Sequence, residues 1–139
     1  MKTILIDAVY TFVLGDKTID TEMYTLLEKY PNKKILLTGA NDEQIIEFGL
    51  VNMPYEIFTL KHNPEKTYPK YYLTLLERYN LKVDDVIYFE HNMKAVESAQ
   101  SVGITSYHYD EEKRDIVALQ KFINSNLKTT SPPRMASGV

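Results

Sequence analysis

The sequence contains no cysteine. Without thiols the chain cannot form disulfides, bind zinc or iron–sulfur clusters through cysteine, or use a thiol nucleophile. It also lacks an excess of positive charge, because 16 Lys and Arg residues stand against 19 Asp and Glu residues and give a net charge of −3. This balance argues against nucleic acid or an anionic membrane as the main partner.

Long apolar runs are missing as well. The longest runs have only a few residues, so none is long enough to span a bilayer, and Asp7 interrupts the apolar beginning of the chain that a signal peptide would need. We therefore expect a cytoplasmic protein with no membrane partner. The length of 139 residues is typical of one domain, and a domain of this size needs no disulfides to be stable.

Three short apolar runs predict the central strands of a sheet. They cover residues 4–6, 35–37 and 86–89 and are apolar throughout, which indicates strands that are buried on both faces, as in a parallel sheet. Two weaker runs, 57–60 and 104–107, would complete a five-stranded sheet.

Helical patterns alternate with these runs. After Asp20, a residue type that often caps helices, apolar side chains recur at helical spacing, and further helices are predicted to begin near Asn41, Pro69, Asn92 and Asp110. This alternation predicts an α/β fold, a Rossmann-like three-layer sandwich with a five-stranded parallel sheet and no cap domain.

Two other segments are predicted separately. Residues 9–18 contain strand-forming residues around a Gly-Asp pair and fit a small hairpin. Residues 128–139 contain two adjacent prolines and no periodicity, so we expect a core domain over 1–127 and a disordered tail over 128–139.

Polar side chains follow the three main strands. Asp7, Thr38 and Glu90 stand at the carboxyl ends, where open parallel sheets bind ligands, and the pattern predicts a polar pocket there. Each of the three also has a plainer interpretation as a residue that only ends a buried strand. Lys66, in a basic loop, is either an anion-binding residue or a solvated surface lysine.

These residues resemble, in order and spacing, the four motifs of the haloacid dehalogenase-like superfamily of hydrolases. Motif I, an apolar strand followed by Asp-x-Asp-Gly-Thr, corresponds to 7–11; motif II, a strand ending in Ser or Thr, corresponds to Thr38. Motif III, a Lys ahead of a helix, corresponds to Lys66, and motif IV, a strand ending in paired acids, to Glu90 and His91. The resemblance extends over residues 2–107.

The resemblance implies a phosphohydrolase. Asp7 would be the nucleophile and form an aspartyl-phosphate. Thr38, Gly39 and Lys66 would bind the phosphoryl oxygens, because phosphoryl transfer depends mainly on positioned charge.

The resemblance also implies a Mg²⁺ site formed by Asp7, the carbonyl of Val9, Glu90 and His91. Two of these positions depart from the family pattern. Val9 replaces the general acid/base and cannot exchange a proton, and His91 replaces an acidic metal ligand, where imidazole favours a transition metal over Mg²⁺. His91 can alternatively be a histidine that begins a helix and faces solvent.

Three functions therefore remain open. The first, which we favour, is a weak or degenerate phosphatase in which Glu90 or Asp16 supplies the lost roles. The second is an inactive protein that binds a ligand or partner through the same pocket. The third is metal-independent, dehalogenase-like hydrolysis, but the intervals 7–38 and 38–66 are too short for the cap domain that such enzymes carry.

The expected partner is a phosphorylated small molecule or macromolecule. A site without a cap stays open, which suits a macromolecular substrate. The eleven tyrosines also suggest a homodimer contact, because tyrosine suits half-buried interfaces.

Overall fold

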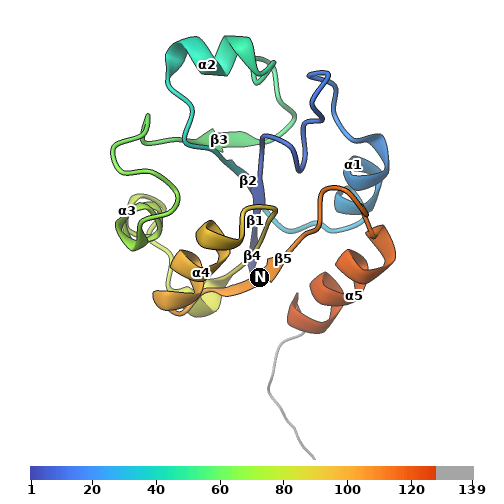
Figure 1. Ribbon diagram of the computed structural model, residues 1–139. Helices are drawn as coiled ribbons and strands as arrows, with labels where there is room; N and C mark the ends of the chain where they lie inside the picture. Colours follow the sequence, from blue (N-terminus) through green and yellow to red (C-terminus); the bar gives the residue numbers. More distant parts are fainter. Residues whose placement is uncertain (128–139) are drawn as a thin grey trace, which may run out of the picture.

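The structure, a computed structural model, describes residues 1–127 (Figure 1). Strands and helices alternate in the order β1 (Thr3–Asp7), α1 (Thr21–Leu27), β2 (Lys34–Leu37), α2 (Asp42–Glu47), β3 (Glu56–Phe58), α3 (Pro69–Arg78), a 3₁₀ turn η1 (Val83–Asp85), β4 (Val86–Glu90), α4 (Met93–Ser101), β5 (Thr105–His108) and α5 (Ile116–Leu127). The predicted disordered tail, 128–139, lies outside the described residues.

The five strands form one parallel sheet in the order β3-β2-β1-β4-β5. β1 is central: Leu5 pairs with Ile35 of β2 on one side and with Tyr88 of β4 on the other. The α/β class and the five-stranded parallel sheet are therefore confirmed. The two outer strands are shifted slightly from the predicted runs.

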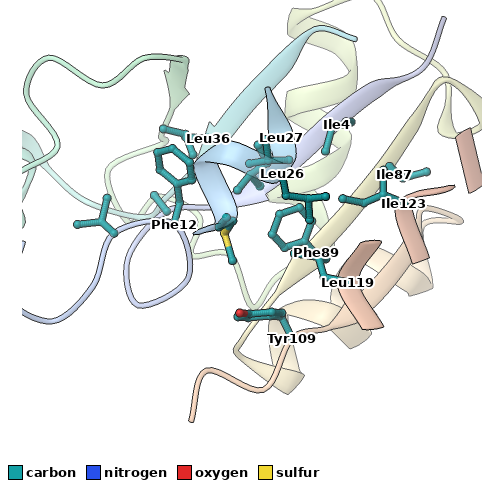
Figure 2. Close-up of a cluster of buried hydrophobic side chains, with 14 of the residues drawn as sticks. Ile4, Phe12, Leu26, Leu27, Leu36, Ile87, Phe89, Tyr109, Leu119 and Ile123 are labelled. Atoms are coloured by element: carbon teal, nitrogen blue, oxygen red, sulfur yellow. The ribbon is translucent and has the colours of Figure 1, made fainter. Parts of the chain in front are cut away.

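The sheet is covered on both faces, which explains why its central strands are apolar throughout. α1 and α5 lie on one face and α3 and α4 on the other (Figure 1). Ile4 and Ile6 pack toward α1 and α5, whereas Leu5 between them packs toward α3 and α4. Figure 2 shows the first of these clusters, where helical Leu27 and Leu119 meet the strand residues. Alternate residues of one strand thus fill two cores.

Most predicted helix starts are confirmed. The side chains of Asp20, Asn41 and Asn92 accept hydrogen bonds from backbone N–H groups at the N-termini of α1, α2 and α4. Asn41 and Gln44 form a full capping box, and Pro69 occupies the first turn of α3. Local capping chemistry thus sets these boundaries.

The predicted start of the last helix at Asp110 is wrong. Asp110 instead accepts hydrogen bonds from the backbone N–H groups of a turn, including that of Glu112. Arg114 then adopts a left-handed backbone with φ of 48°, which no helix can continue through. α5 begins at Ile116, behind Asp115, whose carboxylate caps it.

The predicted hairpin over 9–18 is present only as a compact loop. It is held by two isolated bridges, Val9–Val13 and Val13–Ile19, and contains no regular strand. Within residues 1–127, the connection from β1 to β2 holds only this loop and α1, and the interval from Thr38 to Lys66 holds only α2, β3 and loops. Neither contains a cap domain. Among the same residues, no helix combines the length and apolarity that crossing a bilayer requires.

Candidate active site

Four of the predicted residues meet at the carboxyl ends of the central strands. Asp7 ends β1 and Glu90 ends β4, Thr38 follows β2, and Lys66 reaches the same point from the loop before α3. A pocket opens above them, lined by Asp7, Val9, Tyr10, Thr38, Gly39, Ala40, Phe48, His62, Glu65, Lys66, Thr67, Glu90, His91, Asn92 and Ala95. It lies beside β1, where the strand order reverses, as the sheet topology leads one to expect.

Asp7 is the buried centre of the site, with a relative exposure of 1%. Its Oδ1 accepts a hydrogen bond from Lys66 Nζ at 2.6 Å, and its Oδ2 accepts one from the Thr11 hydroxyl at 2.6 Å. Oδ2 also contacts Nδ1 and the backbone N–H of His91. A buried carboxylate is stable only with such partners.

Lys66 bridges the two carboxylates. Its Nζ lies 2.7 Å from Glu90 Oε1 in addition to its contact with Asp7, and its side chain is 15% exposed. Burial by itself lowers the pKa of Lys66, but the two carboxylates outweigh that effect and raise the pKa above its usual value. Lys66 therefore carries a fixed positive charge and is not a solvated surface lysine.

Glu90 is completely buried. Its Oε1 accepts a hydrogen bond from the Tyr88 hydroxyl and its Oε2 accepts one from the backbone N–H of Asn92 at 3.0 Å. Burial, together with the nearby charge of Asp7, raises the pKa of Glu90 to about 7 despite the opposing effect of Lys66.

Asp7 has the opposite shift. Burial alone would raise its pKa, but the charge of Lys66 and the hydrogen bond from His91 hold the pKa well below its usual value. Asp7 is thus ionised at neutral pH, whereas Glu90 is protonated more readily than an ordinary glutamate. Two carboxyl groups whose pKa values are shifted in opposite directions are typical of sites that divide chemical roles between them.

His91 faces the site and not the solvent. Nδ1 contacts Asp7 Oδ2, and the ring meets the Tyr10 ring edge-on, with 5.8 Å between centroids. Burial lowers the pKa of His91, but its hydrogen bond to Asp7 and the charges of Asp7 and Glu90 outweigh burial and raise it. The alternative of a solvent-facing histidine is therefore wrong.

Asp7, Glu90 and His91 could hold a divalent cation. One ligand atom from each lies within 4.8 Å of the others. Two carboxylates and an imidazole suit a first-row transition metal better than Mg²⁺, which prefers oxygen ligands only. Val9 lines the same pocket, and the part predicted for its carbonyl stays a prediction.

Thr38 and Gly39 are the other residues predicted to bind phosphoryl oxygens. Both line the pocket, and Thr38 Oγ1 accepts a hydrogen bond from the backbone N–H of Ala40 at 3.2 Å. This leaves the hydroxyl hydrogen of Thr38 free to be donated to a ligand. Their binding role itself stays a prediction.

Three residues in or next to the site were not predicted from the sequence to belong to it. Arg114 donates to the carbonyls of Thr11 at 2.5 Å and Tyr10 at 3.1 Å while its Nε bonds the Asp20 carboxylate at 3.0 Å. It ties the loop after β1 to the start of α1, and nothing in the surrounding charged segment signals this contact. Tyr88 stands two positions before Glu90 on one strand, and this same-face spacing was a usable signal.

The third is His62, an exposed residue. It lines the pocket, and its Nδ1 lies 2.6 Å from Glu65 Oε1. A lone histidine in a loop carries no sequence signal of this placement.

Comparisons with known proteins agree with this architecture. No protein-family model and no curated protein sequence matches the chain. A protein of uncharacterised function from Corynebacterium glutamicum has a similar structure, with a TM-score of 0.58 and 14% identity over 89% of this chain and 96% of that one.

Two further solved structures carry family descriptions. One is a HAD family enzyme from Bacteroides thetaiotaomicron, an Asp-to-Ala mutant in complex with magnesium and inorganic phosphate, with a TM-score of 0.58 and 13% identity over 78% of this chain and 93% of that one. The other is the core domain of a candidate phosphoglycolate phosphatase from Streptococcus pneumoniae, with a TM-score of 0.57 and 18% identity over 89% and 96%. With the sheet order and the clustered motif residues, these similarities show that the chain has the fold of the haloacid dehalogenase-like hydrolase superfamily.

Proposed function

We propose that the protein is a haloacid dehalogenase-like phosphohydrolase with a degenerate site, in which Asp7 is the nucleophile. The observation that carries this proposal is an ionised Asp7 at the end of the central strand, held by Lys66 at 2.6 Å beneath an open pocket. The Bacteroides neighbour, which was solved with magnesium and inorganic phosphate, supports a phosphoryl ligand for this fold.

In the first step an oxygen of Asp7 attacks phosphorus and the ester P–O bond breaks. The leaving oxygen keeps the electron pair, and because Val9 has no proton to give, this oxygen takes its proton from solvent. Lys66 and the Thr38 hydroxyl bind the phosphoryl oxygens, on which negative charge is spread in the transition state.

In the second step water attacks phosphorus and the bond to Asp7 breaks. One proton of the water stays on the new P–OH group and the other passes to a phosphate oxygen, so dihydrogen phosphate leaves and the Asp7 carboxylate is restored. Asp7, Glu90 and His91 would hold a divalent cation, which when bound would add positive charge beside the phosphoryl oxygens.

The test is hydrolysis of para-nitrophenyl phosphate with Mg²⁺, Mn²⁺ or Zn²⁺. We expect Asp7→Asn to lose activity by at least about 100-fold, because an amide is a poor nucleophile. Asp84→Asn, which removes an exposed carboxylate in η1 at the opposite end of β4, is the matched control and should retain wild-type activity. Equal rates for wild type and Asp7→Asn would exclude Asp7 as the nucleophile.

A second candidate is an inactive anion-binding protein. It is favoured by the loss of the acid at Val9 and by the contacts that occupy both oxygens of Asp7. Protein that binds inorganic phosphate but hydrolyses no phosphate ester would support this candidate. A cytoplasmic location, a macromolecular substrate and a homodimer stay predictions.

A further inference from the structure

Tyr10 has a backbone conformation that favours glycine. Its φ is 68°, in the left-handed region, where a residue with a Cβ costs free energy, and Gly is the residue of the resembled motif at this position. Two contacts hold the backbone there: Tyr10 N–H donates to the Val13 carbonyl at 2.8 Å, and the Tyr10 carbonyl accepts from Arg114 at 3.1 Å. A strained backbone that hydrogen bonds hold in place beside a pocket is typical of functional sites, so we expect the Tyr10 side chain to have a function.

The side chain of Tyr10 is available to a ligand. It lines the pocket and is 48% exposed, although tyrosine is a large and partly apolar residue. Its ring lies edge-on to His91 and beside Gly15, where an added Cβ would come within 3.8 Å of it. Phe48, Ala40 and Ala95 also line the pocket, so Tyr10 is one of several apolar side chains among its polar and charged ones.

A separate observation concerns the leaving group. Val9 cannot protonate it, so the site suits esters whose oxygen departs as a stable anion. A phenol has a pKa of about 10, against roughly 16 for water, so a phenolate leaves without a proton far more readily than an alkoxide.

From the strained aromatic residue and the missing acid together, we infer that the site takes phosphate monoesters of phenols, with the phenol ring packed against Tyr10. The inference rests on the proposed function, because it assumes that phosphate lies above Asp7. It adds the chemical class of the substrate and assigns Tyr10 as the residue that recognises it.

Binding of non-hydrolysable phosphonates tests the role of Tyr10 without turnover. We expect wild type to bind phenylphosphonate about threefold to tenfold more tightly than methylphosphonate in calorimetry, as ring packing contributes. Tyr10→Gly should lose this preference and keep its affinity for methylphosphonate, whereas Tyr10→Phe should keep the preference. Tyr68→Ala, which removes an exposed tyrosine outside the pocket, is the control.

Each outcome has a distinct meaning. Equal binding of the two phosphonates by wild type, or an unchanged preference in Tyr10→Gly, overturns the assignment of Tyr10 and leaves the phosphohydrolase proposal standing. Failure of wild type to bind either phosphonate overturns both. Because Tyr10→Gly relieves a strained backbone, we expect this variant to fold, which a thermal melt checks.

Kinetics with a series of substituted phenyl phosphates test the leaving-group argument. The wild-type rate should rise steeply with the acidity of the phenol and be lowest for an alkyl phosphate. Val9→Asp, which supplies an acid, should flatten this dependence and raise alkyl phosphate hydrolysis by about 100-fold. A wild-type rate that does not depend on phenol acidity would overturn the argument.

Discussion

Asp7, Thr38 and Lys66 keep the residue types of the motifs that they resemble, whereas Val9, Tyr10 and His91, which line the same pocket, do not. We call the first three the retained half of the site and the other three the changed half. Asp7 and Thr38 of the retained half lie at the sheet ends, with exposures of 1% and 4%, and Lys66 reaches them from the loop before α3. Its charges are paired and largely closed to solvent.

The changed half lies in the two loops that follow β1 and β4. Where the resembled motifs have two acids and a glycine, it has Val9, His91 and Tyr10. In the proposed function, the retained half would bind the anion and the changed half is where the resembled motif has its proton-transfer residue, so the two roles fall on separate parts of the site. A buried charge pair resists change, because removing one partner destabilises the domain. Residues in exposed loops can change at less cost to folding.

Breaking the retained half should have the largest effect. Lys66→Met leaves two buried carboxylates, Asp7 and Glu90, without their shared cation, so we expect the free energy of unfolding to fall by about 3–5 kcal/mol. Urea unfolding measures this change. Lys70→Met, exposed on α3, is the matched control and should change stability by less than about 0.5 kcal/mol. Similar losses in both variants would contradict the buried bridge.

Restoring an acid to the changed half should have a smaller effect that depends on metal. His91→Asp places a third carboxylate beside Asp7 and Glu90, so we expect lower stability without metal and a rise in melting temperature of several degrees with millimolar Mg²⁺. His108→Asp adds the same charge at the nearby end of β5 and should show no such rise. A Mg²⁺ response no larger than that of wild type would contradict the prediction.

The smallest effect expected is a change in pH dependence at Glu90, which contacts both halves. Because its pKa is about 7 in the folded state against a usual value of 4.5, the folded protein binds more protons than the unfolded chain between these values. Stability from this group is therefore present below about pH 4.5 and is lost as the pH rises through 7. His91, whose pKa is also raised, acts in the same direction.

Glu90→Gln should reduce this slope by up to one proton, because glutamine does not titrate. Urea unfolding at about pH 5 and about pH 8 measures the slope, and Glu77→Gln, exposed on α3, is the control. An unchanged slope in Glu90→Gln would show that Glu90 does not hold the excess proton.

The parts of the fold that local chemistry determines were predictable. Apolar runs around Leu5 and Leu36 predicted strands because both faces of the sheet are covered, and the capping box of Asn41 and Gln44 predicted the start of α2. The prediction that the last helix begins at Asp110 was wrong because an aspartate side chain caps turns as readily as helices. The sequence signal does not distinguish the two.

Within the site, positions were predictable and contacts were not. Parallel strand ends share one edge of the sheet, which predicted that Asp7, Thr38 and Glu90 would lie together, and the family resemblance implied that Lys66 joins them. The inward orientation of His91 depends on the conformation of the loop after β4. The hydrogen bond from Arg114 to the Thr11 carbonyl connects residues that are far apart in the chain. Such contacts follow from tertiary packing and leave no local pattern.

The central place of β1 also has a consequence for folding during synthesis. Thr3 pairs with Val86, so one edge of β1 stays open until residue 86 has been made. Contacts so distant in sequence form slowly, and an apolar strand with an open edge is prone to pair with other chains. Asp7, at the end of this strand, therefore meets Glu90 only after residue 90 has been made, and until then the open edge of the strand exposes the nascent chain to aggregation.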